Sequence, residues 1–361
     1  MRMKKPPRAG VWRKLMALVC AAGMLQGWAL PAHAGGTVVL YTLDGLENMY
    51  RDVLPAFERA QQVKVNIVTA GGGDVVNRAN VEKNSPKADV LVTLPPFVQQ
   101  AAGLGLLQPY QGANHAGVPA EAKARDGAWS TLMNNYFSFA VNPNITPHAP
   151  RTFADLLGPE YAGRLAYSNP LTAGDGMAVI ILTTQLMGEG PAFDYLQKLE
   201  HNVKFHTRGT GYLDVLLSRN EIAVANGDVQ MDLDDAANGG LSIKPVFLSV
   251  AAHEPPATLS LPYTIALVKG GPNAANGKKL IDYLLSRDVQ ARMGDYFGIP
   301  GRADVPLTGK NSAAIRSAIA GVRVVPVDWD QVLAKKPAWT ARWKSQVIGH
   351  SDKPLEVVKP K

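Results

Sequence analysis

The chain alternates strand-like and helix-like segments, and this alternation constrains its fold more than any other feature. Apolar runs at Thr37–Thr42 and Ala88–Thr93 are typical of buried strands, and Gln62–Val68 alternates as a further strand. A helical pattern over Leu46–Gln61 separates the first two strands, and another begins at Val75. This order predicts a doubly wound α/β architecture, in which ligands bind at the carboxyl ends of the strands.

A second block of the same kind follows the aromatic, strand-like segment Trp129–Asn142. Strands are predicted at Glu221–Ala225 and Thr264–Val268, and helices at Met177–Met187 and Asn276–Arg292. The two blocks predict two lobes, with the chain crossing between them more than once. The expected boundaries are 35–136 with 264–315 for lobe I, 137–263 with 316–355 for lobe II, and a disordered tail at 356–361.

The first 34 residues have the parts of a secretory signal. A basic start is followed by an apolar run from Leu15 to Leu30, and Ala32-His33-Ala34 precedes Gly35. We expect cleavage after Ala34 and a soluble, exported mature protein. The competing interpretation is a lipoprotein anchor at Cys20, but the residues before it lack the small side chain normally found next to such a cysteine.

The formal charge of +7 comes almost entirely from this leader, which holds six basic residues and no acidic one. Removing these six from the 37 basic residues leaves 31 against 30 acidic residues. The mature chain therefore gives no reason to expect a nucleic-acid partner. Cys20 is the single cysteine, so a mature protein without it has neither a disulfide nor a thiolate metal site.

The segment Leu165–Ile181 has the pattern of an anion-binding loop. A short apolar run ends at Ser168, a loop with Pro170 and two glycines follows, and a helical pattern starts at Met177. Such a loop directs free backbone N–H groups at one point, where the helix dipole also favours negative charge. The alternative is an ordinary strand-to-helix turn with an aspartate near the helix start.

Two other loops could present backbone N–H groups in the same way. They are Gly71–Asp74 and Gly209–Gly211, and either could equally be a flexible turn. Neither Gly209–Gly211 nor Gly270–Lys279 completes a nucleotide-binding motif. The histidines are scattered without zinc-site spacing, and no Gly-x-Ser-x-Gly motif occurs. We therefore expect no catalytic residues, no metal site and no cofactor.

Asp44, Asp175 and Asp228 each lie in a loop that follows a predicted strand. An aspartate in such a position is usually a helix cap or a turn residue. Three of them at one sheet edge, among loops that can bind an anion, predict a ligand that carries both charges.

Several segments together resemble the periplasmic 2-aminoethylphosphonate-binding proteins of bacterial ABC importers. These segments are Tyr41–Leu46, Gly71–Gly73, Ala88–Phe97, Ala173–Gly176, Ala225–Met231, Leu261–Tyr263 and Ile299–Val305. The chain is more distantly similar to ferric-iron-binding proteins, which hold iron with two adjacent tyrosines where this chain has Asn226–Val229. The resemblance implies a two-lobe, type II periplasmic-binding-protein fold that closes around its ligand. It also implies a periplasmic, monomeric protein that delivers this ligand to a membrane permease.

For such a ligand we expect the phosphonate on backbone N–H groups at helix starts and the ammonium on a carboxylate. The candidates for the carboxylate are Asp228, Asp175 and Asp44, in that order. Tyr136 and Tyr263 could close over the ethyl spacer or serve the hinge. The predicted ligand-binding residues are Thr42, Asp44, Gly72, Gly73, Thr93, Tyr136, Ser168, Ala173, Gly174, Asp175, Gly176, Thr210, Asn226, Asp228 and Tyr263.

The two-lobe pattern does not encode the solute, so phosphate, a polyamine or ferric iron stays open as the ligand. A protein of a different class, an exported phosphoester hydrolase or transferase, would need a nucleophile or a metal cluster. The sequence offers neither.

Overall fold

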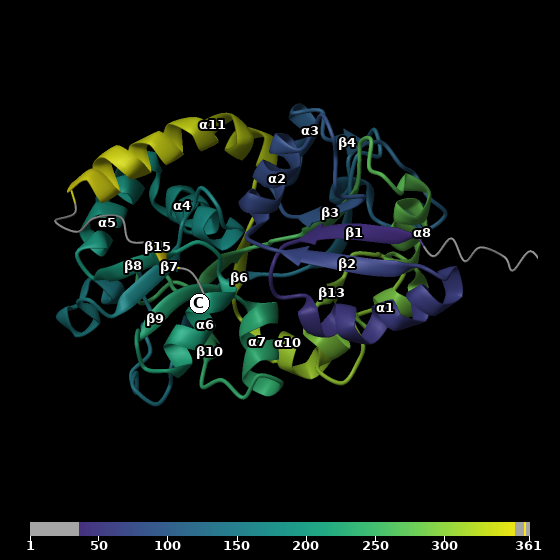
Figure 1. Cartoon of the computed structure of the whole chain (residues 1–361). Coiled ribbons are helices and arrows are strands. Elements are labelled where there is room, and N and C mark those ends of the chain that lie inside the picture. Colours follow the sequence, from purple (N-terminus) through teal and green to yellow (C-terminus); the bar gives the residue numbers. More distant parts are fainter. Residues whose placement is uncertain (1–35, 351–356, 359–361) are drawn as a thin grey trace, which may run out of the picture. The chain divides into compact units, whose positions relative to one another are not determined.

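The fold is built on two β-sheets, seen in the computed structural model, which describes residues 36–350 and 357–358 (Figure 1). The first sheet consists of β1 (Thr37–Thr42), β2 (Lys64–Thr69), β3 (Val90–Thr93), β4 (Leu107–Gln108), β5 (Ser130–Asn134), β12 (Tyr263–Val268) and β13 (Ile299–Pro300). The second consists of β6 (Phe137–Val141), β7 (Leu165–Ser168), β8 (Val203–Thr207), β9 (Val224–Asp228), β10 (Lys244–Val246) and β15 (Val357–Val358). A small third sheet pairs β11 (Ala257–Leu259) with β14 (Arg323–Val325).

Helices pack around both sheets in the order that the sequence pattern predicts. They are α1 (Glu47–Gln61), α2 (Gly72–Val81), α3 (Phe97–Gly103), α4 (Gly174–Met187), α5 (Glu189–Glu200), α6 (Gly211–Ser218), α7 (Val229–Ala237), α8 (Ala274–Leu284), α9 (Arg287–Ala291), α10 (Ser312–Ala318) and α11 (Trp329–Arg342). The predicted α/β class is confirmed. We call the elements around the first sheet lobe I and those around the second sheet lobe II; the residue boundaries between the lobes stay a prediction.

Both sheets are mixed rather than purely parallel. In lobe I, β1 pairs in parallel with β2 and β3, whereas β12 runs antiparallel to β3 and β5. In lobe II, β7 is parallel to β8 and β9, whereas β6 runs antiparallel to β9. Both β6 and β12 follow a crossing between the lobes, β6 directly after β5 and β12 directly after β11.

Several element boundaries differ from the sequence expectation. The predicted segment Trp129–Asn142 divides into β5 and β6, which belong to different sheets. The predicted helix over Asn276–Arg292 is two helices, because the Ser286 side chain accepts the N–H of Val289 and caps a new helix there. Strand β8 has no counterpart among the predicted elements.

The two longest helices next to the sheets are buried in different ways. In α1, Met49, Tyr50, Val53, Leu54 and Phe57 are buried, a helical spacing that leaves the other face in solvent. In α4 every residue from Gly174 to Thr184 is buried. A helix that is apolar on all sides must be covered on all sides, so α4 forms the centre of lobe II.

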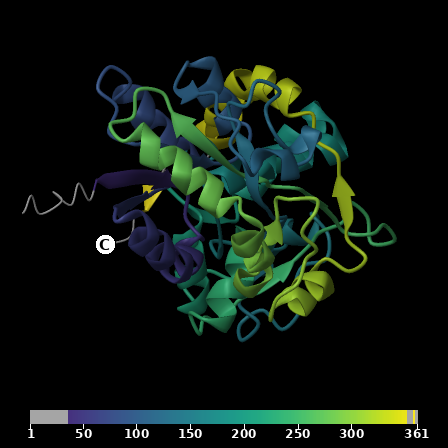
Figure 2. The same ribbon diagram turned by 90° about the vertical axis from the view of Figure 1, so that its right-hand side faces the viewer.

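The C-terminal part of the described chain docks onto the body of the protein. After β14 the chain enters α11, drawn in yellow in Figures 1 and 2. Trp339 is buried, and Trp343 is buried and donates its indole N–H to the Tyr167 hydroxyl at 2.7 Å. Further on, β15 pairs in parallel with β8, inside the segment that we expected to be disordered.

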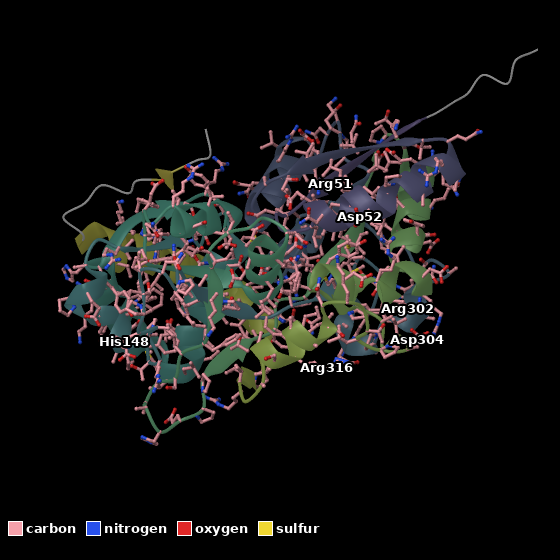
Figure 3. The ribbon with its side chains drawn as sticks, turned by 90° about the horizontal axis from the view of Figure 1, so that it is seen from below. Arg51, Asp52, His148, Arg302, Asp304 and Arg316 are labelled. Atoms are coloured by element: carbon pink, nitrogen blue, oxygen red, sulfur yellow. The ribbon has the colours of Figure 1, made fainter. Side chains whose placement is uncertain are left out.

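The family segment Ile299–Val305 has a structural role in lobe I. The buried Arg302 donates to Asp304 at 2.9 Å and to the backbone carbonyls of Asn114 and Leu285 (Figure 3). It therefore joins three stretches of chain that are distant in sequence.

The residues from Gly35 onward form one compact unit. The predicted signal sequence, its cleavage after Ala34 and the anchor considered at Cys20 lie outside the described residues. Within the part of the chain that the structure describes, no helix has the length and apolar character needed to cross a membrane.

Candidate functional site

A cavity of about 600 Å³ lies between the two lobes, at the edge where the sequence analysis expects a ligand. Lobe I contributes the loops before α1 and α2, and lobe II contributes the loop before α6, part of α6 and one side of α7. Its lining residues are Asp44, Gly45, Glu47, Thr69, Ala70, Gly71, Asp74, Arg208, Gly209, Gly211, Tyr212, Val215, Met231 and Asp235. We call this cavity the cleft.

Direct bonds join the two lobes beside the cleft. Arg208 donates two hydrogen bonds to the Asp74 carboxylate, one of them from Nη2 at 2.8 Å. The N–H of Gly211 donates to Asp44 Oδ2 at 2.9 Å, and the N–H of Gly73 donates to the Thr172 carbonyl at 3.0 Å. The structure is therefore a closed arrangement of the lobes.

A chain of buried polar side chains in lobe II ends on Asp175. The Asn226 amide donates to Ser168 Oγ at 3.0 Å, and Ser168 Oγ lies 3.3 Å from Thr210 Oγ1. Thr210 in turn donates to Asp175 Oδ2 at 2.6 Å, so Ser168 is the donor to Thr210. The other oxygen, Asp175 Oδ1, is buried without any hydrogen-bond partner. Asp175 lies behind the cleft lining, beyond Thr210, whose neighbours Gly209 and Gly211 are lining residues. Asp214 and Asp232 also have buried oxygens without a partner, so Asp175 is one of several carboxylates that a ligand donor could satisfy.

Asp228 is buried as well, but both of its oxygens are engaged. It ends β9 and caps α7, where Oδ1 accepts the N–H of Met231 at 2.8 Å. Oδ2 accepts the Tyr263 hydroxyl at 2.5 Å. The sequence pattern placed Asn226 and Asp228 in a loop, whereas both belong to β9.

Carboxylates dominate the electrostatics of this region. Burial raises the pKa of Asp44, Asp175 and Asp228, and the charge of Asp228 raises the pKa of Asp175 further. Burial also raises the pKa of Asp235, in the cleft wall, to about 6. The cleft lining holds four carboxylates and a single basic side chain, Arg208. A cation bound among these groups would relieve their mutual repulsion.

The glycines of the predicted anion loops act mainly in close packing. Gly72 and Gly73 belong to the first turn of α2 rather than to a loop, and a Cβ on Gly73 would lie 2.7 Å from the Phe97 ring. Ala173 precedes α4, whose first turn contains Gly174, Asp175 and Gly176 and starts earlier than predicted. A Cβ on Gly174 would lie 2.4 Å from the Leu94 side chain of lobe I. The start of α4 therefore faces the other lobe at close range.

Of the predicted ligand-binding residues, Asp44 is the one that lines the cleft, and the others lie outside its lining. Three of these, Thr42, Thr93 and Tyr136, make contacts elsewhere. The Thr42 hydroxyl contacts the Tyr50 hydroxyl at 3.0 Å, and the Thr93 hydroxyl donates to the Gly72 carbonyl at 2.8 Å, both inside lobe I. Tyr136 is half-buried between β5 and β6, where it bridges to Ser260, at a crossing between the lobes. This place agrees with the hinge alternative for Tyr136, and the ligand roles of the three residues stay predictions.

Several cleft residues were not predicted from the sequence, and Arg208 is the most consequential of them. It follows β8, a strand whose alternating sequence Val203-Lys204-Phe205-His206-Thr207 is a period-2 pattern that could have revealed it. With that strand assigned, Arg208 would have been a strand-end residue at the ligand edge. Glu47 and Asp235 carry no such signal, because they lie on helices, and Asp74 was considered only as the last residue of the Gly71–Asp74 loop.

A polar cleft between two α/β lobes is the architecture of a solute-binding protein, and the comparisons agree. Residues 85–335 match the family described as bacterial extracellular solute-binding protein, and the chain belongs to this family. A relative from Salmonella typhimurium is 36% identical over 319 residues, which cover 87% of this chain and 93% of the relative. Its provisional name is 2-aminoethylphosphonate-binding periplasmic protein. The resemblance stated from the sequence is thereby confirmed as a relationship.

Solved structures confirm the two-lobe, type II fold. The periplasmic binding protein P5PA superposes with a TM-score of 0.76 at 22% identity, covering 86% of this chain and 99% of that one. AfuA from Actinobacillus pleuropneumoniae, with fructose-6-phosphate bound, superposes with a TM-score of 0.74 at 21% identity, covering 87% of this chain and 99% of that one. Among the described residues of the present chain, no group of three or more histidine, cysteine, aspartate or glutamate side chains is placed to hold a metal ion.

Proposed function

We propose that this protein is the periplasmic solute-binding component of an ABC importer and that its solute is 2-aminoethylphosphonate. The name of the Salmonella relative, at 36% identity over nearly the full length of both chains, supports this solute. The proposal includes export by the N-terminal leader and delivery of the solute to a membrane permease. The family and the relatives are solute-binding proteins, which supports a role other than catalysis.

The unpartnered oxygen of Asp175 is the observation that carries the proposal. A buried carboxylate with an unsatisfied oxygen, next to a second buried carboxylate, is costly unless a cation neutralises it. A primary ammonium supplies both the charge and the hydrogen-bond donors. We assign the amine to Asp175 before Asp228, because Asp228 already accepts hydrogen bonds on both oxygens.

Two groups are available for the phosphonate. The N–H groups in the first turn of α4 have no partner within the helix, and the positive end of its dipole lies there. Arg208 is the only basic side chain in the cleft lining, and its guanidinium can bind two phosphonate oxygens. The third anion loop is less available, since Asp44 occupies the N–H of Gly211 in the closed arrangement.

Calorimetric titration of the ligand-free protein with 2-aminoethylphosphonate tests the proposal. We expect one molar equivalent to bind, and ethylphosphonate to bind about 10- to 150-fold more weakly, because it lacks a charge-assisted hydrogen bond. Asp175→Asn should weaken the binding of 2-aminoethylphosphonate by a similar factor and leave the binding of ethylphosphonate nearly unchanged. This pattern would assign the amine to Asp175.

Asp89→Asn is the matched control, because Asp89 is also buried but accepts the backbone N–H groups of Val39 and Asn273 away from the cleft. It should lower stability without changing affinity. Equal binding of the two phosphonates by the wild-type protein would contradict a carboxylate that binds the amine. The absence of any heat on addition of 2-aminoethylphosphonate would contradict the proposal that it is the solute.

A polyamine is the second candidate, favoured by the four carboxylates of the cleft lining against one guanidinium. Spermidine, phosphate, fructose-6-phosphate and ferric citrate therefore belong in the same titration as comparators. A turnover assay on a generic phosphoester, with and without divalent metal, distinguishes a solute-binding protein from the hydrolase alternative.

A further inference from the structure

A second cavity, of about 560 Å³, lies on the other side of the Arg208–Asp74 ion pair from the cleft. Its walls come from α2 and α3 of lobe I, from the loop between β7 and α4 of lobe II, and from α11. Figure 1 shows α11 as the yellow helix that reaches from beside α5 to α2 and α3, and α11 contacts α3. We call this space the α11 cavity. Asp74 and Arg208 line both cavities.

The two cavities differ in the sign of their charge. The cleft lining has four carboxylates and one guanidinium, whereas the charged residues of the α11 cavity are Asp74, Arg208 and Lys336. Because Asp74 is paired with Arg208, the ammonium of Lys336 is the uncompensated charge of the α11 cavity. A cation that faces a cavity attracts an anion into it.

Lys336 lies in an environment that suits an anionic ligand. Its ammonium donates to the Gln100 side-chain carbonyl and stands 4.3 Å from the centre of the Phe97 ring. No carboxylate of the described residues forms an ion pair with it, whereas the preceding Lys335 pairs with Glu189 at 3.2 Å. Burial without a counter-charge lowers the pKa of Lys336 to about 8. A bound anion would remove this penalty.

Polar groups surround Lys336 on the other walls. Gln100 uses its carbonyl oxygen on Lys336, which leaves its amide NH₂ as a donor. Asn77 presents a further amide from α2. Arg208 donates two hydrogen bonds to Asp74 and is 48% exposed, so other N–H groups of its guanidinium stay available. Donors from several directions around a cation are the arrangement that a small oxyanion needs.

We propose that the α11 cavity is a second ligand site, which binds a small oxyanion of the phosphate type through Lys336, with Arg208, Gln100 and Asn77 as further donors. This site is separate from the solute cleft and goes beyond the proposed function. Because its walls come from both lobes, a bound oxyanion contacts both and favours their closed arrangement. Arg208 links the two sites, since it is a wall of each.

Titration with inorganic phosphate tests the proposal, followed by calorimetry and by phosphorus NMR. In protein saturated with 2-aminoethylphosphonate we expect one further equivalent of phosphate to bind. Lys336→Gln should weaken this binding at least tenfold, and Lys336→Arg should keep it within about threefold, since the charge is retained. Lys335→Gln is the matched control, one residue earlier on α11, and should change nothing.

Asn77→Asp provides an independent variant, because Asn77 is exposed on α2 and the change adds a negative charge to the opposite wall without altering size. Asn77→Asp should also weaken phosphate binding at least tenfold. Unchanged binding in Lys336→Gln, an equal loss in Lys335→Gln, or displacement of phosphate by 2-aminoethylphosphonate mole for mole would each overturn the proposal. The comparison of the variants with phosphate alone remains decisive even if 2-aminoethylphosphonate does not bind at all.

Discussion

The ion pair between Arg208 and Asp74 should hold the lobes closed, and its contribution can be worked out from its geometry. The guanidinium makes two parallel hydrogen bonds to a carboxylate that is 9% exposed, while the guanidinium itself is 48% exposed. A buried charge-assisted hydrogen bond contributes roughly 1.5–3 kcal/mol, and exposed pairs contribute well under 1 kcal/mol. For this half-exposed pair we expect about 1–2 kcal/mol, which changes the ratio of closed to open protein by a factor of about 5–30.

A double-mutant cycle with Asp74→Asn and Arg208→Gln measures this contribution directly. The chain from Gly35 onward contains no cysteine, so dyes can be attached at Val81→Cys on α2 and Lys198→Cys on α5, both exposed and in different lobes. Single-molecule energy transfer between them then reports the closed fraction of the ligand-free protein. Each single variant should shift the population toward the open form, and the double variant should open little further.

The closed fraction should also fall with added salt in the wild-type protein, because the guanidinium is partly exposed to screening ions. The double variant should lose most of this salt dependence. A coupling energy below about 0.3 kcal/mol, which is the usual limit of additivity, would refute the reasoning. So would a closed fraction that rises in either single variant.

Three further predictions concern the walls of the site and the lobe I core. Burial raises the pKa of Asp235 to about 6, so the folded protein keeps a proton that the unfolded chain releases. Urea denaturation should therefore show that the free energy of unfolding falls as pH rises from about 4 through 6. This dependence on pH should be shallower in Asp235→Asn. An unchanged dependence in the variant would contradict the raised pKa of Asp235. Gly176→Ala would place a Cβ 2.1 Å from the Ser168 carbonyl oxygen and should lower the free energy of unfolding by about 1–3 kcal/mol. Gly190→Ala on α5 is the control, because it has open space around it and should be neutral or slightly stabilising in the same assay. The hydrogen bond from Arg302 lowers the pKa of Asp304 to about 2. Asp304→Asn should therefore lower the thermal midpoint near pH 7, and this effect should shrink as pH falls from about 4 toward 2. An equal effect at pH 7 and pH 2 would argue against the Arg302–Asp304 pair.

Local patterns in the sequence carry much of this protein's architecture. The apolar runs of β1, β3 and β12 and the helical spacing of α1 predict those elements. Burial of a strand on both faces leaves a continuous apolar run, and burial of one helix face leaves a period. The loops that carry Asp44 and the start of α4 follow predicted strands, so the sequence predicts that they lie at the edge where such folds bind ligands. The family relationship, too, could be recognised from short segments of the chain.

Element ends were less predictable than elements. Helices α2 and α4 begin at glycines, Gly72 and Gly174, which sequence propensity assigns to loops. The approach of Phe97 and Leu94 to these helix starts explains why small residues are needed there. Such close approach is a property of the packed protein and leaves no period in the sequence.

The tertiary structure alone decided which charges meet. Arg208 and Asp74 are 134 residues apart and come from different lobes, and Lys336 reaches its cavity from the C-terminal helix. Packing also distinguished two similar aspartates, because Tyr263 and the start of α7 satisfy Asp228, whereas one oxygen of Asp175 stays unpartnered. A sequence determines its elements through interactions between near neighbours. Ion pairs and orphaned oxygens depend on distances across the chain, which only the folded arrangement of both lobes defines.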